Sequence, residues 1–550
     1  MKNFEKIIIN RPLGLIAIFT ILGILVYYFS DFNLIGTVIL VVPLIFFSYF
    51  FLDLDNFYIA IIFFLIAILS SNMYYSPNFE EGIQSFRVIK VEDNEILGRI
   101  KGRIVEVKNE TLENIEYGEK IYGLIKFKED RDLERGYVGK IFLKKVISKE
   151  KDLTYKIKNI PKNYYEALKE NFSPSESALL NSILWGDKEN LSYNQRDFLS
   201  DLGVIHLICI SGFHISLLFS LIYKRFSFKI ALSLCIVYVI LVGASSSSLR
   251  ALIMISILKS SKRIFKTYDP ISSISLSAIV LLIYRPYNLF SMGFLLSFLG
   301  TLGIILFYKK LLEAFYMLPR GVNEYLSLGF SAQAFIYPFL LLSFGKFSIN
   351  FLISTFLVTP IIVILLQILL FSILLGGNFI NIMVFLINIV FLIFRGILSF
   401  LDKVSWVTPY TPPIFAFAYM TMFLFMYMTF KGFKNFKIGV YLVVPTLIFS
   451  LYVFGAKVKV LEDKWNKAII IEEGFNRVAL VNNNSDYFKR SIMKKEYVNS
   501  VIHIKKDAYI NLTKKYSLSI EDNFNKVTLM PEKRDYDIID LIQRKSAYIL

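Results

Sequence analysis

Two of the three histidines in this 550-residue chain stand close together at the start of an apolar run, in the segment His206–His214 (HLICISGFH). Polar groups at membrane depth are costly and usually face a protein interior or a water-filled path. On one continuous helix, His206, Ser211 and His214 would project from the same side, because each residue turns the helix by about 100°. Such a face, with Gly212, fits the lining of a path as well as it fits a second role. The alternative is packing between helices, where small residues allow close approach.

The residue types around this segment restrict the chemistry that it can perform. Ser211 and His214 suit a nucleophile and its base, but no Asp or Glu lies in the adjacent apolar runs to orient the base. Two histidines without a nearby carboxylate or thiolate make a poor metal site. Cys209 and Cys235 both lie in apolar runs and predict neither a disulfide nor a zinc site. Because the chain also has no GxxxxGK-S/T loop, we expect no metal, no nucleotide and no other cofactor.

A second polar cluster, Ser245–Ser248, stands directly before Leu249 and Arg250 in a later apolar run. Serines can cap the helix that follows, and free amides beside a guanidinium form an anion-binding helix end. The alternative is an ordinary arginine whose charged head reaches the membrane surface. Ser297 is a small polar residue inside another apolar run, which indicates packing or pore lining, and Arg395 near the end of its own run fits either role.

The elements that carry these residues are membrane helices. Hydrophobic residues make up 55% of the chain and charged residues 19%, with a mean hydropathy of +0.54. A helix needs about 20 apolar residues to cross a bilayer, so the recurring apolar runs predict a polytopic α-helical membrane protein of about 11–13 spans and exclude disordered, coiled-coil and disulfide-rich secreted classes. Two of the runs are short for a crossing and would suit broken helices: 249–258 and 271–283. The others are 13–29, 34–52, 57–69, 204–223, 226–242, 289–307, 325–344, 351–375, 379–394, 414–430 and 438–454.

The net charge of +17 comes mostly from Lys and Arg residues that set the orientation of the chain in the membrane. If the N-terminus is cytoplasmic and every run crosses, the cytoplasmic loops hold 16 Lys and Arg residues and the opposite short loops hold three. This bias predicts a cytoplasmic N-terminus, with residues 72–203 and 455–550 outside the cytoplasm. The outer interval 77–160 itself carries 18 basic against 16 acidic residues, so net charge says little about nucleic acid.

The polar interval after the third run predicts a small β domain. Short β-rich segments separated by glycine and charged turns predict a barrel of the oligonucleotide-binding (OB) type; they are 86–91, 96–107, 120–127 and 139–147. Basic and aromatic residues alternate there in a way that suits phosphate contact and base stacking, although a solvated barrel face is the alternative. The candidates are Tyr122, Lys126, Phe127, Lys128, Lys140 and Phe142.

The remaining soluble segments complete a five-part division. After Pro161 we expect a polar, amphipathic helical connector, with a capping box from Ser173 to Glu176. Strands are expected in the C-terminal tail at 467–472 and 477–481. The predicted parts are N-terminal membrane helices (1–71), the OB-like domain (72–160), the connector (161–202), a second membrane domain (203–455) and the tail (456–550).

Four ordered motifs resemble those of the ComEC-type competence protein family, which are DNA-uptake channels of the bacterial inner membrane. Trp185-Gly186-Asp187 followed by His206–His214 resembles the GD…HLLAISGLH signature of that family, and Ser248-Leu249-Arg250-Ala251 resembles its S-x-x-R-A step. Pro286 followed by Gly293–Phe298 resembles its P…GFQLSF segment, with Leu295 where Gln is usual. The resemblance covers roughly residues 10–455.

The resemblance implies a channel that passes one DNA strand into the cytoplasm during natural transformation. The implied partners are single-stranded DNA, a DNA receptor, a cytoplasmic ATP-dependent motor, a separate nuclease, the lipid bilayer and a second copy of the chain. The residues implied for the DNA path are His206, Ser211, Gly212, His214, Ser248, Arg250 and Ser297, and those implied to be structural are Gly186, Asp187, Pro286 and Gly293. The alternatives are a small-molecule or lipid transporter and an intramembrane Ser/His hydrolase or acyltransferase.

The tail departs from the family pattern. Many members end in a metallo-β-lactamase-like domain, and residues 461–484 resemble its start. That fold binds metal through a clustered H-x-H-x-D-H loop, whereas this tail has one histidine, His503. We expect a reduced remnant without metal, and therefore no nuclease or other enzyme activity.

Overall fold

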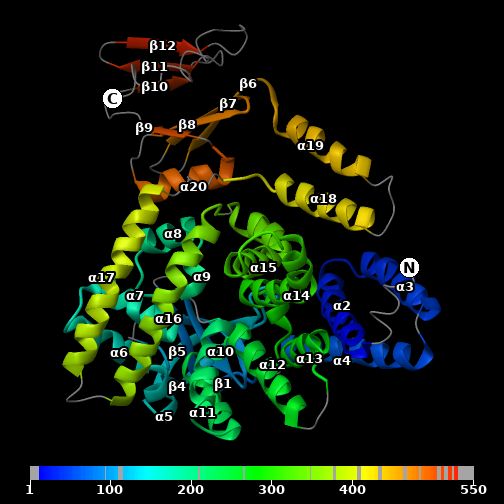
Figure 1. Cartoon of the computed structure of the whole chain (residues 1–550), viewed down its shortest axis with the longest axis vertical. Helices are drawn as coiled ribbons and strands as arrows, with labels where there is room; N and C mark the ends of the chain where they lie inside the picture. Colours follow the sequence, from blue (N-terminus) through cyan, green and yellow to red (C-terminus); the bar gives the residue numbers. More distant parts are fainter. Residues whose placement is uncertain are drawn as a thin grey trace. The chain divides into compact units, whose positions relative to one another are not determined.

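The computed structural model describes residues 11–529, except 52, 78, 93–94, 110–114, 209–210, 264–266, 347, 376–379, 405–409, 431–436, 463–466, 482–484, 499, 504–508, 513–517 and 523–524. The chain forms two compact units. The first comprises Met1–Phe335 and Asn350–Ser405, and the second comprises Ile336–Ile349 and Trp406–Leu550. The two units are described separately below, and Figure 1 shows the elements in sequence colours.

The N-terminal helices are α2 (Pro12–Phe32), α3 (Leu34–Phe51) and α4 (Leu54–Tyr75). A Cβ atom placed on Gly23 of α2 would lie 2.5 Å from the carbonyl oxygen of Phe64 on α4. Glycine is therefore required for the backbones of α2 and α4 to come this close.

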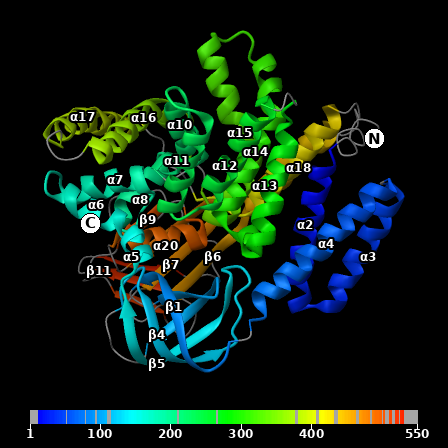
Figure 2. The ribbon, with the colours of Figure 1, turned by 90° about the horizontal axis from the view of Figure 1, so that it is seen from below.

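The predicted barrel is present and closed (Figure 2). Its strands follow the order β1-β2-β3-β5-β4, with β3 and β5 parallel and the other pairs antiparallel. The predicted strand at 96–107 is two strands, because Lys101 and Gly102 have φ of 45° and 86° and form a turn. The strands are β1 (Gly82–Glu92), β2 (Glu95–Ile100), β3 (Arg103–Asn109), β4 (Lys120–Lys128) and β5 (Tyr137–Glu150).

Tyrosines fix the β4–β5 connection to the membrane helices. Tyr75 at the end of α4 donates a hydrogen bond to the Leu133 carbonyl at 2.8 Å, and Tyr74 donates to the Gly136 carbonyl at 3.0 Å. Gly136 has φ of 75°, and a Cβ there would lie 2.5 Å from the Tyr287 ring. The barrel is thus held by specific polar and aromatic contacts at one end.

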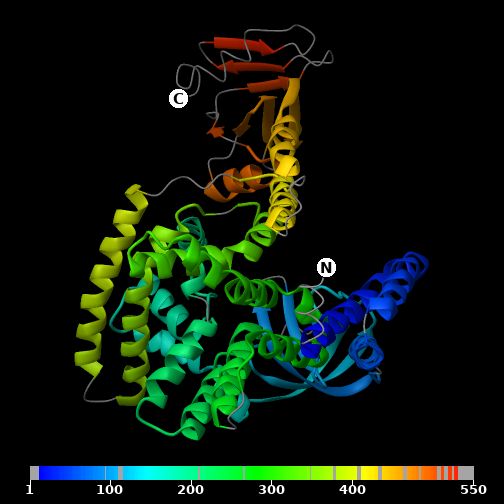
Figure 3. The same cartoon turned by 45° about the vertical axis from the view of Figure 1, so that its right-hand side comes forward.

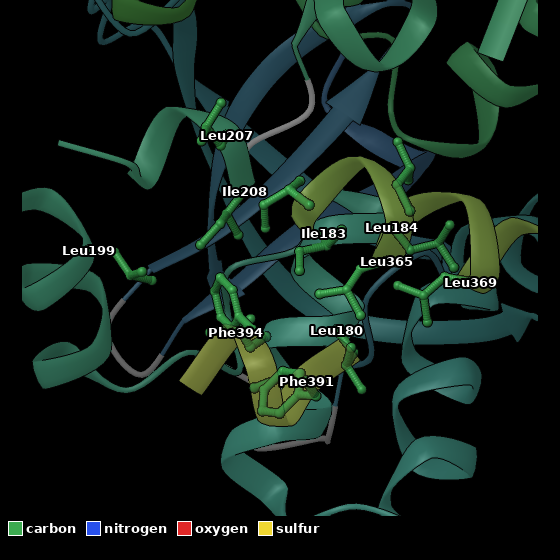
Figure 4. Close-up of a cluster of buried hydrophobic side chains, with 14 of the residues drawn as sticks. Leu180, Ile183, Leu184, Leu199, Leu207, Ile208, Leu365, Leu369, Phe391 and Phe394 are labelled. Carbon is green, nitrogen blue, oxygen red and sulfur yellow. The ribbon is translucent and has the colours of Figure 1, made fainter. Parts of the chain in front are cut away.

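The connector contains α5 (Leu153–Lys158), α6 (Ile160–Lys169), α7 (Pro174–Trp185) and α8 (Tyr193–Asp201). The predicted capping box at Ser173 is confirmed. The expected polar, amphipathic character is wrong for α7, because every residue from Ser177 to Trp185 is buried. Leu180, Ile183 and Leu184 pack against α16 and α17 in the largest core of the first unit (Figure 4).

The first unit continues with a series of mostly apolar helices. They are α9 (Ile205–Ile208), α10 (Gly212–Tyr223), α11 (Phe228–Leu241), α12 (Ser246–Arg263), α13 (Pro270–Tyr284), the 3-10 helix η1 (Pro286–Phe290), α14 (Met292–Ala314), α15 (Arg320–Phe344, which enters the second unit), α16 (Phe351–Leu375) and α17 (Ile380–Val404). Within the described residues, six helices are long and apolar enough to cross a bilayer: α2, α4, α14, α15, α16 and α17. The chain is a multi-pass membrane protein with an inserted barrel, as the composition predicts.

The second unit combines two apolar helices with two small sheets (Figure 3). The predicted strands at 467–472 and 477–481 are confirmed as β7 and β8. This unit includes the apolar helices α18 and α19 together with the predicted tail, and β6 begins two residues after α19 ends. The elements are α18 (Ile414–Phe430), α19 (Lys437–Leu451), a sheet of β6 (Val453–Glu462), β7 (Lys467–Gly474), β8 (Asn476–Val481) and β9 (Ser500–His503), the helix α20 (Asp486–Glu496), and a sheet of β10 (Tyr509–Leu512), β11 (Leu518–Asp522) and β12 (Asn525–Leu529).

Candidate functional site

The histidine segment contains a helix start. Ser211 has extended backbone and accepts a hydrogen bond from the Phe213 N–H at 3.2 Å, while its own N–H donates to His214 Nδ1 at 3.3 Å. The imidazole here takes the place of the Glu or Gln side chain of an ordinary capping box. Because Ser211 is extended and caps the start of α10, the expectation of one continuous helix is wrong.

His206, Ser211 and His214 therefore do not share one helix face. His206 is exposed, with its Nδ1 2.9 Å from the Gly203 carbonyl oxygen. His214 is buried, and its Nδ1 lies 3.3 Å from Ser211 Oγ. The predicted Ser–His pair is in contact, but among the described residues no carboxylate bonds the other ring nitrogen. Cys209 of the same segment lies outside the described residues, and Cys235 is a buried free thiol.

Three residues from three separate motifs meet at one point. Arg250 Nε on α12 donates a hydrogen bond to Ser297 Oγ on α14 at 2.9 Å. A Cβ added to Gly212, at the start of α10, would lie 2.8 Å from Arg250 Nη2. We call Gly212, Arg250 and Ser297 the Arg250 junction. Glycine at 212 is what allows the guanidinium to lie against the first turn of α10.

The serine cluster holds the start of α12, as predicted. Ser245 Oγ accepts a hydrogen bond from the Ser248 N–H at 3.3 Å, and the Ser248 hydroxyl donates to the Ser245 carbonyl at 2.8 Å. Ser248 is fully buried. Its hydroxyl thus stabilises the helix that presents Arg250.

The Arg250 junction carries positive charge without a described acidic partner. The guanidinium contacts Ser297, Met254 Sδ at 3.4 Å and the Phe298 ring, whose centre is 5.9 Å away, and no described carboxylate pairs with it. The nearby start of α10 adds the positive end of a helix dipole. A guanidinium beside helix amides is the arrangement that binds phosphate and other anions.

The predicted structural motifs fall at helix ends. Gly186 ends α7 in the left-handed conformation with φ of 70°. Asp187 then accepts hydrogen bonds from Asn181 Nδ2 at 3.1 Å and from the Glu189 N–H at 2.9 Å. These contacts fix the end of the buried helix α7.

The other predicted framework residues differ in how the structure explains them. Pro286 is buried and starts η1. A Cβ on Gly293 would meet nothing within 4 Å, so packing does not require glycine there. Arg395 on α17 forms an ion pair with Glu176 on α7 at 3.0 Å, which assigns it a structural contact.

The predicted barrel face is only partly available. Lys126 and Lys128 on β4 stand opposite Phe142 and Lys140 on β5, and opposed residues share one side of a sheet. Phe127 is the exception, because its ring packs edge-to-face on Phe79 at 5.0 Å, against the barrel core. Its predicted role on the outer face does not fit this placement.

Carboxylates hold several of the other candidates. Lys140 Nζ is 2.7 Å from Asp130 and 3.5 Å from Glu106. Tyr122 donates a hydrogen bond to Glu150 at 3.3 Å, and Lys126 lies 3.9 Å from Glu81. The lysines of this face are therefore largely neutralised, and Phe142 and the exposed Lys128 are its most available groups.

A second basic group on the barrel was missed by sequence reasoning. Arg87 on β1 stands opposite Arg99 on β2, and Lys158 at the end of α5 is close enough for their charges to affect it. Burial, then Arg99 and Arg87, lower the pKa of Lys158 to about 8. We call Arg87, Arg99 and Lys158 the β1–β2 basic cluster. Sequence spacing does not signal this cluster, because the pairing of β1 with β2 brings Arg87 and Arg99 together.

The β1–β2 basic cluster has more cations than nearby acids. Asp152 binds Arg87 through both oxygens, at 2.9 and 2.5 Å, and this contact holds the pKa of Asp152 well below its usual value. Arg99 Nε is buried and has no hydrogen-bond partner among the described residues. Lys158 Nζ lies 5.7 Å from the centre of the Tyr117 ring. Cations beside an aromatic ring suit a nucleic-acid strand.

Comparison with known proteins places the junction inside a recognised family region. Residues 183–434 match the Competence protein family. This range contains Gly186, Asp187 and the whole Arg250 junction, while the barrel lies outside it. The chain is 28% identical over 222 residues to "ComE operon protein 3" of Bacillus subtilis (strain 168), an alignment that covers 39% of this chain and 28% of that protein.

Two mycoplasma proteins are also similar. "Uncharacterized protein MG316" of Mycoplasma genitalium is 34% identical over 117 residues, which cover 20% of this chain and 30% of that protein. Its homolog in Mycoplasma pneumoniae is 33% identical over 105 residues, or 18% and 27% of the two chains. The chain thus matches less than a third of the length of each of these relatives. No solved structure matches it.

Proposed function

We propose that this chain, which belongs to the competence protein family through residues 183–434, carries single-stranded DNA across the cytoplasmic membrane. The observation that carries the proposal is the Arg250 junction. Its three residues come from three sequence motifs, and its guanidinium has no carboxylate partner among the described residues. A DNA strand carries one negative phosphate per nucleotide, and such a phosphate would pair with the Arg250 guanidinium.

At the junction, a phosphate would accept charge-assisted hydrogen bonds from Arg250, beside the positive end of the α10 dipole. Ser297 positions the guanidinium through its Nε, Nη1 contacts Met254 Sδ, and Nη2 lies beside Gly212 at the start of α10. One such contact is strong enough to attract a phosphate and weak enough to release it to the next, which a conducting path requires. The strand would advance by exchanging phosphates at this point.

The barrel would gather the strand before it reaches the membrane helices. The β1–β2 basic cluster supplies cations beside Tyr117, and Phe142 supplies an aromatic side chain on the β4–β5 face. Stacking and phosphate contacts of this kind bind single strands with little sequence preference. In this proposal the N-terminus is cytoplasmic, the barrel and tail lie outside, and a separate motor and nuclease supply energy and remove the other strand.

The test is uptake of labelled DNA by cells that carry Arg250→Ala in place of the native chain. We expect uptake to fall by about tenfold or more, because hydrogen bonds to charged groups contribute about 1.5–3 kcal/mol. Arg320→Ala is the matched control, since Arg320 is exposed and pairs with Glu324 on its own helix. Normal uptake by a membrane-inserted Arg250→Ala chain would remove the junction from the path.

A second candidate is an intramembrane hydrolase or acyltransferase, which the contact between Ser211 Oγ and His214 Nδ1 at 3.3 Å favours. Such an enzyme would be labelled at Ser211 by a serine-reactive fluorophosphonate, and His214→Ala would abolish the labelling. We expect no labelling, because Ser211 Oγ accepts the Phe213 amide as a helix cap.

A further inference from the structure

The second unit contains a pocket of about 490 Å³ where its apolar helices meet its larger sheet. The walls come from the start of α18, the end of α19, strands β7 and β8, and the end of α20. The lining residues used below are Ile414, Leu451, Glu472, Arg477, Lys495 and Tyr497. The pocket lies entirely within one unit and is separate from the Arg250 junction and the barrel.

The pocket lies at one end of the paired apolar helices α18 and α19. Helices α18 and α19 are neighbours, and a Cβ on Gly439 would lie 2.7 Å from the Phe425 ring (Figure 3). The pocket takes the first residue of α18, Ile414, and the last residue of α19, Leu451. In the proposal made below, α18 and α19 lie in the membrane, so that the end of the pair that carries the pocket lies at the depth of lipid headgroups.

Exposed aromatic residues mark the same depth. Tyr452, directly after α19, and Phe475, between β7 and β8, pack edge-to-face at 5.2 Å. They are 43% and 53% exposed, respectively. Tyrosine and other aromatic side chains concentrate at the boundary between lipid tails and water, where an amphipathic ring is most stable.

The polar groups of the pocket favour a phosphate. Among the described residues, Lys495 has no carboxylate within 4.0 Å, and the Tyr497 hydroxyl has no hydrogen-bond partner. Arg477 Nε is 3.9 Å from Glu472, a buried carboxylate. Glu472 is paired with Arg477, and Glu496 also has a partner, so the open donors of the pocket are those of Lys495 and Tyr497. Such donors suit the oxygens of a phosphate.

We propose that this pocket binds the phosphate of a phospholipid headgroup. Arg477, Lys495 and Tyr497 hold the phosphate oxygens, while Ile414 and Leu451 contact the glycerol and the first methylenes. The bound lipid ties the sheet and α20 to the membrane surface beside α18 and α19. The proposal does not depend on DNA transport, because neither the junction nor the barrel takes part.

The test uses the full-length protein, extracted from membranes that contain phosphatidylglycerol and a neutral glycolipid, with retained lipid measured by mass spectrometry. We expect phosphatidylglycerol to be retained and the glycolipid, which lacks phosphate, to be lost on washing. Lys495→Gln should lower phosphatidylglycerol retention about fivefold, the effect of one cation near an anionic headgroup. Lys494→Gln, an exposed lysine beside it that does not line the pocket, should leave retention unchanged.

Four results would overturn the proposal. If Lys494→Gln and Lys495→Gln lowered phosphatidylglycerol retention equally, the attraction would be a general one to the charged surface. If the glycolipid were retained as well as phosphatidylglycerol, the pocket would not recognise phosphate. Displacement by inorganic phosphate at the concentration of the lipid would identify a free-phosphate site, and displacement by single-stranded oligonucleotide a DNA site. Arg477→Gln removes a contact to buried Glu472, so its retention value counts only if its melting temperature matches the native chain.

Discussion

The Arg250 junction and the β4–β5 face of the barrel both present cations near aromatic rings, but the groups that contact those cations differ. On the barrel, Lys140 has two carboxylate partners, and Lys126 has one at long range. At the junction, Arg250 has a hydroxyl, a thioether and an aromatic ring. An arginine held by neutral groups keeps its charge for a ligand. The difference teaches that the surroundings of each cation, and not the number of cations, identify an anion path.

The largest effect expected from this comparison comes from Gly212→Val. Its Cβ would stand 2.8 Å from Arg250 Nη2 and 3.1 Å from the Ala251 Cβ, so the guanidinium must leave the start of α10. We expect DNA uptake to fall by tenfold or more, as for loss of a charged hydrogen bond of about 1.5–3 kcal/mol. Uptake of labelled DNA by cells is the measurement.

Gly293→Val is the matched control, because a Cβ at Gly293 meets nothing within 4 Å. It should leave uptake near the native level. If both valine variants lost uptake equally, glycine would matter for helix packing in general, and the special placement of Arg250 would lose its support.

An intermediate effect is expected from pH acting on the β1–β2 basic cluster. The pKa of Lys158 is lowered to about 8, so Lys158 is charged at pH 7 and mostly neutral at pH 9. A phosphate prefers the charged form, and affinity for a single-stranded oligonucleotide should therefore fall as pH rises through 8. One ion contact near a surface changes affinity about fivefold at most. Fluorescence anisotropy with the full-length protein measures this change.

Two variants sharpen the pH experiment. Lys158→Gln should bind more weakly at pH 7 and lose the change between pH 7 and 9. Lys120→Gln is the control, because its hydrogen bond to Tyr122 raises the pKa of Lys120 and keeps it charged over this range. A native chain whose affinity is flat from pH 7 to 9 would contradict a role for Lys158.

The smallest effect is expected where a barrel cation is already paired. Asp152 has a pKa held well below its usual value by Arg87, so the pair stabilises the folded barrel at neutral pH and is lost as pH falls toward that lowered pKa. Asp152→Asn should lower the melting temperature at pH 7 by a few degrees, and the difference should shrink in acid. Uptake measured below the melting temperature should change little. A large uptake defect in a stable Asp152→Asn chain would erase the contrast between paired and unpaired cations.

Much of the fold could be predicted because it follows from local patterns. Apolar run length predicted the membrane helices, and alternation with glycine turns predicted the barrel. Helix α7 was misjudged because two of its buried polar side chains donate hydrogen bonds within the segment: Ser182 donates to the Ala178 carbonyl, and Asn181 donates to Asp187. Such a helix can be buried while its composition looks polar.

The sequence predicted which residues form the candidate site but not how they are arranged. The motifs identified Gly212, Arg250 and Ser297, yet only the packing of α10, α12 and α14 brings them together. The break at Ser211 was missed because a histidine replaces the acidic residue of a normal capping box. The β1–β2 basic cluster depends on strand register, which spacing in the sequence does not reveal.

The central claim is that the entering strand passes the Arg250 junction, and cross-linking tests it most directly. Ser297→Cys, in a chain whose Cys209 and Cys235 are replaced by alanine, places a small thiol at the junction. Cells would take up DNA that carries thiol-reactive groups on its backbone and is stopped during entry by a bulky end. We predict a cross-link at position 297 and none at Ile240→Cys, an exposed residue of the apolar helix α11. A Ser297→Cys chain that imports DNA normally but never cross-links to it would contradict the account.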